Sequence, residues 1–259
     1  MGYPRILYQN RVPAATLTTT GGTVTVGHPL SLLTTWRDYY RAAWSGANSY
    51  VIKIYNGATS LSYQSVAISG HNLFTCGARF KVEDCDDDST WVERVAYTTP
   101  SSNKTLALFF TQVSKKYTRF TIDNNGGAVF SPEIGVLFVG NYLEFPEYLT
   151  TPFDPDAHRI NKSSAQGDTG RILGTTVDFR SRTVNVSFSY LSSTWINATW
   201  FPFWNAQYAT PFIFCHDPEN YAAAAYLMEF DVDAMSVPFI NSAWRGPLTL
   251  VMRGLYEEG

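Results

Sequence analysis

The sequence has few charged residues. Lysine, arginine, aspartate and glutamate make up 16% of its 259 residues, whereas an average soluble domain has roughly 25%. The formal net charge is −3, and basic residues adjoin only at Lys115-Lys116. Because a protein that binds nucleic acid needs a basic patch or stripe, we expect no nucleic-acid partner.

Cysteine is also scarce. Cys76, Cys85 and Cys215 form an odd set, and no C-x-x-C spacing occurs. A disulfide framework is therefore not expected in a chain of this length. We interpret all three as free, buried thiols.

Long apolar segments are missing as well. No run approaches the ~18 residues of a membrane helix, so we expect no membrane insertion. The opening segment, MGYPRILYQNRVPAATL, lacks the apolar core of a signal peptide. We therefore expect synthesis and folding in a cytosol.

Aromatic residues, by contrast, are plentiful at 15%, and hydrophobic residues reach 45%. Many aromatic and β-branched residues with few charges favour strands over helices. Interface cores are also poor in charge and rich in aromatics, so the composition favours a surface that is partly covered in an assembly.

Residues 50–140 show the alternation of short strands. Each apolar run alternates with period 2 and is bounded by glycine, asparagine, aspartate or proline. The spacing of roughly 10–15 residues is typical of a β-sandwich, whereas residues 1–49 read as mainly loop. The expected strands are YVIKIY (50–55), YQSVAIS (63–69), GARFKVED (77–84), TWVERVAY (90–97), KTLALFFT (104–111), YTRFTID (117–123) and IGVLFVG (134–140).

A polar, proline-rich stretch at residues 146–170 separates two parts of the chain. We predict a first domain over 1–150, a linker over 151–170, and a smaller, mainly β second domain over 171–259. In the second domain, TVNVSFSY (183–190) alternates as a half-buried strand. Ser192 or Ser193 is expected to cap one short helix that Pro202 ends or kinks.

Gly70-His71-Asn72 follows the second expected strand and contains a candidate catalytic histidine. A catalytic histidine needs a nucleophile or carboxylate partner. Ser69 is adjacent in sequence and so points to the opposite face, and no G-x-S-x-G elbow occurs. The structural alternative is a histidine that holds a loop, beside an asparagine that bonds turn backbone.

The cluster EDCDDDST offers two interpretations. Asp84, Asp86 and Asp88 match the D-x-D-x-D opening of a calcium loop, but Ser89 and Val95 replace its glycine and bidentate glutamate. The simpler alternative is a hairpin turn in which aspartate bonds the local backbone. His158 and the triplet Cys215-His216-Asp217 lack zinc spacing, so we expect neither a metal nor a cofactor.

The run TWINATWFPFWNAQY contains three tryptophans close together. They either belong to the core or form an exposed surface for a sugar or a partner protein. Our candidate binding or interface residues are Trp195, Trp200, Trp204, Phe153, His71 and Asn72. No pair of acidic residues stands out as the machinery of a glycosidase, so no catalytic residue is assigned and we do not expect an enzyme.

Several motifs together resemble a known family. YQSVAISGHNL, DDDSTWVERV, KKYTRFTID and PEIGVLFVGNYLEFP, with WRDYYRAAW upstream, resemble the discoidin-like, galactose-binding-like jelly rolls of tailed-phage structural proteins. The match covers about residues 35–150, and FRSRTVNVSF and TPFIFCHDPENY resemble a second part of such proteins. The resemblance implies an all-β fold, a jelly-roll β-sandwich followed by the second β-rich domain, and supplies no catalytic residue.

The resemblance also implies a function. It predicts a virion protein of the tail, tail tip or baseplate that is assembled in the host cytoplasm. Its partners would be other tail or baseplate proteins, and it would form a homo-oligomeric ring. The alternative is a carbohydrate-binding module or a receptor-binding tip that contacts a cell-surface glycan.

Overall fold

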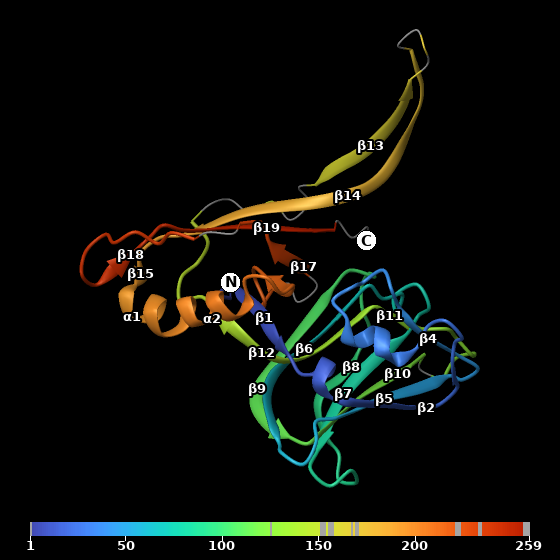
Figure 1. The fold of residues 1–259 in the computed structure, drawn as a ribbon. Helices are drawn as coiled ribbons and strands as arrows, with labels where there is room; N and C mark the ends of the chain where they lie inside the picture. The colour runs from blue at the N-terminus through green and yellow to red at the C-terminus, as the bar shows by residue number, and fades with distance from the viewer. Residues whose placement is uncertain are drawn as a thin grey trace. The chain divides into compact units, whose positions relative to one another are not determined.

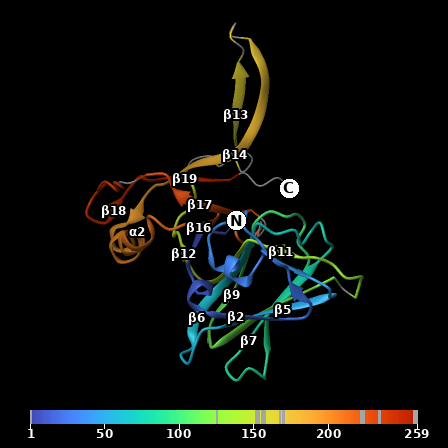
Figure 2. The ribbon, with the colours of Figure 1, turned by 45° about the vertical axis from the view of Figure 1, so that its right-hand side comes forward.

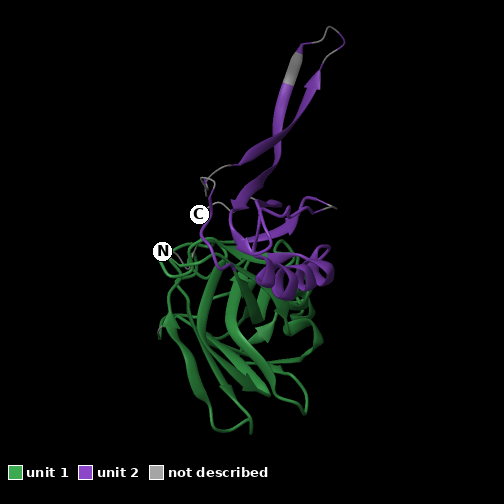
Figure 3. Cartoon of the chain, turned by 90° about the vertical axis from the view of Figure 1, so that its left-hand side faces the viewer, with its two compact units in different colours: residues 1–144, 213–226, 258–259 green, residues 145–212, 227–257 purple. Residues whose placement is uncertain are grey.

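A computed structural model describes residues 2–124, 126–150, 154, 158–166, 168, 171–220, 224–232 and 235–255. The chain forms two compact units, coloured green and purple in Figure 3. Unit 1 comprises Met1–Glu144 and Ile213–Tyr226, and unit 2 comprises Phe145–Phe212 and Leu227–Glu257. Within the described residues, no helix is long and apolar enough to cross a membrane.

Unit 1 is a jelly-roll β-sandwich (Figure 1). The unit 1 strands of the nine-stranded sheet have the order β16-β1-β12-β6-β9, and the five-stranded sheet has the order β2-β5-β10-β7-β8. From β5 onward the chain passes repeatedly from one sheet to the other, as in a jelly roll. The strands are β1 (Arg5–Asn10), β2 (Thr16–Thr20), β5 (Ser49–Tyr55), β6 (Leu61–Ser69), β7 (Arg79–Cys85), β8 (Val92–Thr98), β9 (Leu106–Lys115), β10 (Tyr117–Asp123), β12 (Val136–Glu144) and β16 (Phe212–Cys215).

Smaller elements complete unit 1. They are a three-stranded sheet of order β11-β4-β3 and two 3₁₀ turns, at Val12–Ala14 and Leu30–Thr34. The three strands of that sheet are β3 (Thr23–Val24), β4 (Ala42–Ser45) and β11 (Glu133–Ile134).

The core of unit 1 follows from the alternation of its strands. In β5, Tyr50, Ile52 and Ile54 are fully buried while the residues between them are partly exposed. Ile52 pairs with Phe120 of β10, which pairs with Val82 of β7. Because side chains alternate across a strand, this register places one face of the sheet in the core and leaves the other face open to solvent.

The strands expected over residues 50–140 are confirmed to within a few residues. The expectation of loop over residues 1–49 was wrong, because β1, β2, β3 and β4 lie there. Ile6 and Leu7 of β1 are fully buried, and β1 pairs with β12 on one side and β16 on the other. Those partners lie more than a hundred residues away, so no local pattern indicates them.

Unit 2 contains the sheet strands β13 (Arg159–Gln166), β14 (Ile172–Phe188), β17 (Ala225–Phe230) and β19 (Leu248–Leu255). The second half of β14 pairs with β19, from Ser181↔Leu255 to Phe188↔Leu248. Val184, Val186 and Phe188 are buried, which confirms the predicted alternation as far as residue 188. Tyr190, expected on the same face, is 64% exposed and lies beyond the end of β14, so the prediction was wrong there. The short strands β15 (Leu191–Ser192) and β18 (Trp244–Arg245) pair separately.

The helical segment of unit 2 begins at Ser192, whose hydroxyl accepts a hydrogen bond from the Trp195 N–H at 3.1 Å. It runs through α1 (Ser193–Trp195), a π-helical turn (Ile196–Trp200) and α2 (Phe201–Gln207). Pro202 was expected to end or kink this helix; it does not end it, because α2 continues to Gln207. Pro202 lies in the first turn of α2, directly after the π turn. The π turn changes the backbone hydrogen bonding at the position where a proline would otherwise disrupt the helix.

Part of the expected linker is a strand. β13 lies inside residues 151–170 and pairs with the first half of β14 (Figures 1 and 2). Residues 174–179 of β14 are all exposed, as are most residues of β13. We call the paired residues 159–166 and 172–181 the ribbon. The boundary between the units lies after Glu144 instead of near residue 150, and Ile213–Tyr226 belongs to unit 1.

Candidate functional site

His71 holds two loops together. Its side chain is 1% exposed, and the backbone N–H of Leu73 donates to Nδ1 at 3.3 Å. Nε2 therefore carries the proton, which it donates to the Lys104 carbonyl at 2.9 Å. Burial lowers the pKa of His71 to about 4; the Lys104 hydrogen bond opposes this shift and the charge of Arg41 adds to it. Both ring nitrogens are occupied by backbone, as a structural histidine requires.

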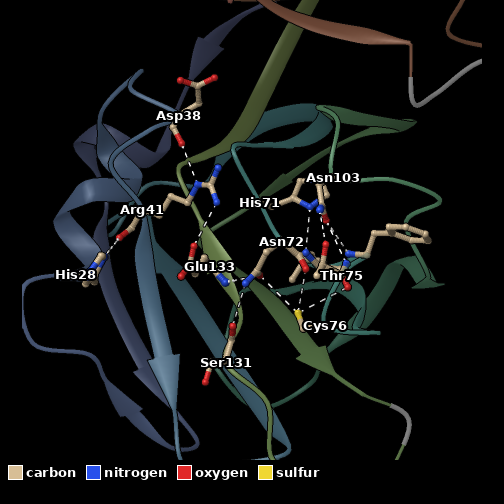
Figure 4. A network of polar contacts seen from close by, with 12 residues as sticks. His28, Asp38, Arg41, His71, Asn72, Thr75, Cys76, Asn103, Ser131 and Glu133 are labelled. Atoms are coloured by element: carbon tan, nitrogen blue, oxygen red, sulfur yellow. Dashed lines mark hydrogen bonds and ion pairs between the residues drawn. The ribbon is translucent and has the colours of Figure 1, made fainter. Parts of the chain in front are cut away.

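Asn72 connects the end of β6 to the segment before β12 (Figure 4). Its Nδ2 donates to the Ser131 carbonyl at 3.1 Å, and its Oδ1 accepts from the Glu133 N–H at 2.8 Å. Asn103 acts similarly nearby, since its Oδ1 accepts from the backbone N–H groups of Phe74 and Thr75. We call His71, Asn72 and Asn103 the loop network.

Two glycines allow a third segment to pack against this network. A Cβ at Gly70, where φ is +62°, would lie 2.1 Å from the carbonyl oxygen of Asp38, and one at Gly135 would lie 2.4 Å from the same atom. The 37–41 segment is fixed further by Arg41, whose guanidinium lies 3.2 Å from the Glu133 carboxylate. The glycines thus permit a backbone approach that no other residue allows.

The acidic cluster forms the predicted hairpin turn between β7 and β8, which pair antiparallel. Asp87 accepts from the N–H groups of Ser89 and Thr90 and from the Thr90 hydroxyl, and these bonds hold its pKa well below the usual range. Asp84 faces away from the turn into the core, where Arg94 donates to both of its oxygens at 2.6 and 3.0 Å. Across the described residues, no group of three or more acidic, histidine or cysteine side chains is arranged to hold a metal.

The tryptophans of the helical segment lie in the core of unit 2. Trp200 is fully buried, Trp204 is 8% exposed, and Trp195 is half-buried. Trp200 contacts the rings of Phe145 and Phe203, and Trp204 lies 4.8 Å from the ring of Phe230. Trp200 and Trp204 therefore belong to the core, and little of their surface is left for a partner. Phe153 lies outside the described residues.

A different set of residues forms a cleft on the open face of the β2-β5-β10-β7-β8 sheet. The strand register aligns Thr18, Lys53, Arg119 and Glu83 in one row across that face. The β7–β8 hairpin adds Asp88 and Trp91 above the row, enclosing a volume of about 310 Å³. We call this the Trp91 cleft; its lining residues are Thr18, Thr19, Thr20, Val51, Lys53, Asp88, Trp91 and Arg119.

The side chains of the cleft are held by ion pairs. Lys53 Nζ lies 2.7 Å from Asp88 Oδ2, and Arg119 Nε donates to Glu83 Oε2 at 2.7 Å. The Arg119 guanidinium lies 4.2 Å from the centre of the Trp91 ring, within range of a cation–π interaction. Trp91 is half-buried, so its position is supported while part of the ring remains accessible.

The cleft combines an aromatic ring with hydroxyl, ammonium, guanidinium and carboxylate groups. Sequence reasoning missed it, because β2 was not expected and the pairing of β5 with β10 joins residues 62 to 74 positions apart. Within β5 and β10, the alternation of buried and partly exposed residues leaves Lys53 and Arg119 on the face opposite the core. In the sequence, the other indication of the site was Trp91, which directly follows the acidic turn between β7 and β8.

Comparisons with known proteins give the following results. No family model matches the sequence, and no curated protein matches it either. Among solved structures, a chitosan-binding module from Paenibacillus sp. IK-5 is 17% identical with a TM-score of 0.43, covering 51% of this chain and 98% of the module. A pectin-binding carbohydrate-binding module is 17% identical with a TM-score of 0.40, covering 51% of this chain and 91% of its own.

A third similar structure is CpGH89CBM32-5 from Clostridium perfringens, in complex with GalNAc-β-1,3-galactose. It is 11% identical with a TM-score of 0.41, and the match covers 50% of this chain and 98% of that module. These structural neighbours are carbohydrate-binding modules. Such low TM-scores and identities assign neither a family nor a ligand to the present chain.

Proposed function

We propose that unit 1 binds a carbohydrate in the Trp91 cleft. The observation that carries this proposal is the half-buried Trp91 ring, supported by Arg119 and facing a volume of about 310 Å³ lined with polar groups. A sugar ring has an apolar C–H face that packs on an aromatic ring, and its hydroxyls hydrogen-bond to charged and hydroxyl side chains. The cleft has the size of a small-ligand site.

In this proposal the chain binds and does no chemistry. The acidic residues closest to the cleft, Asp88 and Glu83, each accept from a cationic side chain. Both carboxylates are already occupied by cations of the protein, whereas cleavage of a sugar needs two carboxyl groups that face the scissile bond. The ion pairs thus favour recognition over catalysis.

The test compares two variants, Trp91→Ala and Tyr97→Ala, which remove aromatic rings from the same face of the sheet. Tyr97 of β8 is a matched control, because its ring lies 4.1 Å from the Arg79 guanidinium, as Trp91 lies against Arg119, but it does not line the cleft. A glycan array would first identify a ligand, and calorimetry would then measure its affinity. We expect Trp91→Ala to weaken binding about tenfold or more, a loss of about 1.4 kcal/mol, and Tyr97→Ala to leave it unchanged.

Equal affinities of Trp91→Ala and the wild-type protein for the identified glycan would refute the cleft as the site. Loss of binding in both variants would mean that the ligand lies elsewhere on the sheet face or that the variants are misfolded. Thermal unfolding of each variant distinguishes these two explanations.

A second function, assembly into a larger structure, is favoured by the ribbon. Ile160, Val177 and Phe179 on the ribbon are 40%, 51% and 52% exposed, and several exposed apolar side chains on one short element mark an interaction surface more often than a single one does. We propose as the second candidate that the ribbon contacts neighbouring subunits in an assembly such as a phage tail or baseplate, the role that the sequence resemblance predicts.

Light scattering over a concentration series tests the assembly proposal. Val177→Asp is expected to abolish any concentration-dependent increase in mass, because it places a charge in an apolar contact. Thr176→Asp, the neighbouring exposed position on the opposite face of β14, is the control and should leave the mass unchanged. Identical behaviour of the two variants and the wild-type protein would refute a role for this face of the ribbon.

A further inference from the structure

The charged side chains that line the Trp91 cleft are neutralised within the protein. Lys53 donates to both oxygens of Asp88, at 3.0 and 2.7 Å. Arg119 is paired with Glu83, which also contacts Lys81 at 3.0 Å. Each charged side chain that lines the cleft therefore already has a partner of opposite sign, although Glu83, the partner of Arg119, lies outside the lining and is shared with Lys81.

This pairing affects which sugars can enter. A uronate or sialate carboxylate that approached Lys53 would meet Asp88, and one that approached Arg119 would meet Glu83. A protonated amino sugar would meet the two cations in the same way. Each charged ligand would have to displace an existing partner, and like charges repel at these distances.

A neutral sugar avoids this conflict. A hydroxyl can donate to the Asp88 carboxylate and accept from the Lys53 ammonium at the same time, so both bonds are charge-assisted and the ion pair stays intact. Thr18 and Thr20 add hydroxyls at the border of the cleft formed by β2.

We infer that the ligand of the Trp91 cleft is an uncharged saccharide, and that the Lys53–Asp88 pair selects against charged ones. This inference rests on the proposed carbohydrate binding and assigns its substrate class. Asp88 is the position to test, because it has φ +59° and asparagine adopts this conformation as readily as aspartate. Asp88→Asn thus removes the charge without a change in the turn.

The experiment uses the full chain on an array of neutral glycans, glycans with uronate or sialate, and deacetylated amino glycans, followed by calorimetry on matched neutral and charged oligosaccharides. The wild-type protein should prefer the neutral class. Asp88→Asn leaves Lys53 without its partner, and we expect affinity for the acidic class to rise about fivefold relative to the neutral class, the size of one exposed ion pair. The gain should shrink at high salt, because screening weakens exposed charges.

Asp86→Asn is the matched control. Asp86 lies in the same turn and pairs with Lys115 at 2.6 Å, but it does not line the cleft, so the variant should keep the wild-type preference. Lys53→Met should shift the preference in the opposite direction, toward amino glycans.

The outcomes separate the two proposals. A wild-type protein that binds acidic or basic glycans more tightly than neutral ones, with a loss in Trp91→Ala, overturns the charge selection and leaves carbohydrate binding standing. An unchanged preference in Asp88→Asn also overturns the charge selection. A wild-type protein that binds no glycan of any class overturns both.

Discussion

The loop network and the Trp91 cleft are both polar clusters of unit 1 beside a turn, and they use their polar atoms differently. His71, Asn72 and Asn103 direct their side chains to backbone groups of other loops. Lys53, Asp88 and Arg119 pair with other side chains at the surface, and Arg119 also contacts a tryptophan ring. The polar atoms of the loop network are occupied by hydrogen bonds to the backbone. The polar atoms of the Trp91 cleft lie at the surface, where a ligand could also hydrogen-bond to them.

The difference shows that residue type alone does not mark a site. Histidine and asparagine are common in active sites, yet here burial and backbone partners occupy them. Changes in the loop network should therefore alter stability and leave binding intact, whereas changes in the cleft should do the reverse. The predictions below test this separation, from the largest expected effect to the smallest.

The largest effect is expected for Gly70→Ala. The new Cβ would overlap the Asp38 carbonyl at 2.1 Å in a left-handed conformation, so we expect the free energy of unfolding to fall by about 4 kcal/mol. Gly77→Ala is the control, because Gly77 has φ +67° but open space around it, and should cost about 1 kcal/mol. Urea unfolding measures both, and equal losses would show that the Asp38 contact is unimportant.

His71 should make stability depend on pH. Its folded pKa of about 4 lies below the ordinary histidine value of 6.5, so the folded state resists protonation that the unfolded state accepts. The stabilisation is complete above about pH 6.5 and is lost as the pH falls toward 4, by about 3 kcal/mol in total. Urea midpoints from pH 7 to 4 measure this loss. His71→Gln should flatten the profile in that window, and an unchanged slope would exclude His71 as its cause.

Asn72→Ala should cost about 2 kcal/mol, because it removes one donor and one acceptor that serve the backbone of Ser131 and Glu133. Glycan affinity should stay within twofold of the wild-type value if the loop network is purely structural. A variant with normal stability and lost binding would reverse the roles assigned to the two clusters.

Trp91→Ala should cost about 1 kcal/mol or less in stability, because the ring is only half-buried. It should weaken glycan binding tenfold or more. Asn72→Ala should do the opposite and lower stability with little change in glycan affinity. Thermal unfolding and calorimetry on the same samples make the comparison, and a stability loss without a binding loss would assign Trp91 to packing.

Asp88→Asn should have the smallest effect on stability, about 0.5 kcal/mol, because both members of its ion pair are more than one-third exposed. Asp84→Asn provides the contrast within the same stretch of sequence, since Asp84 is buried and paired with Arg94, and should cost about 3 kcal/mol. Similar losses would contradict the assignment of Asp88 to the surface and Asp84 to the core.

The strands of residues 50–140 were predictable because each carries its own alternation. Tyr50, Ile52 and Ile54 indicate the buried face of β5 without reference to any other strand. The turn at Asp87 was predictable for the same reason, since its side chain bonds groups two and three residues away.

The strands β1 and β2 were not predictable, nor was the Trp91 cleft. Ile6 and Leu7 are too few to show a period, and β1 is a strand because β12 and β16 pair with it. The boundary of the units was missed for a related reason. Ile213–Tyr226 returns to unit 1 from a distant point in the chain, and proline and polar residues near 151–170 indicated a linker where β13 pairs with β14.

The sequence by itself determined the β character of the chain, the inner and outer faces of its main strands and the turn between β7 and β8, because these depend on neighbours within a few residues. The tertiary structure alone decided which polar side chains are occupied by backbone hydrogen bonds and which lie at the surface, accessible to a ligand. Lys53, Asp88, Trp91 and Arg119 come together through strand pairing, while His71 and Asn72 are occupied by loops that lie thirty to sixty residues away. A binding cleft is a property of such long-range pairings, since it needs side chains from several strands on one face.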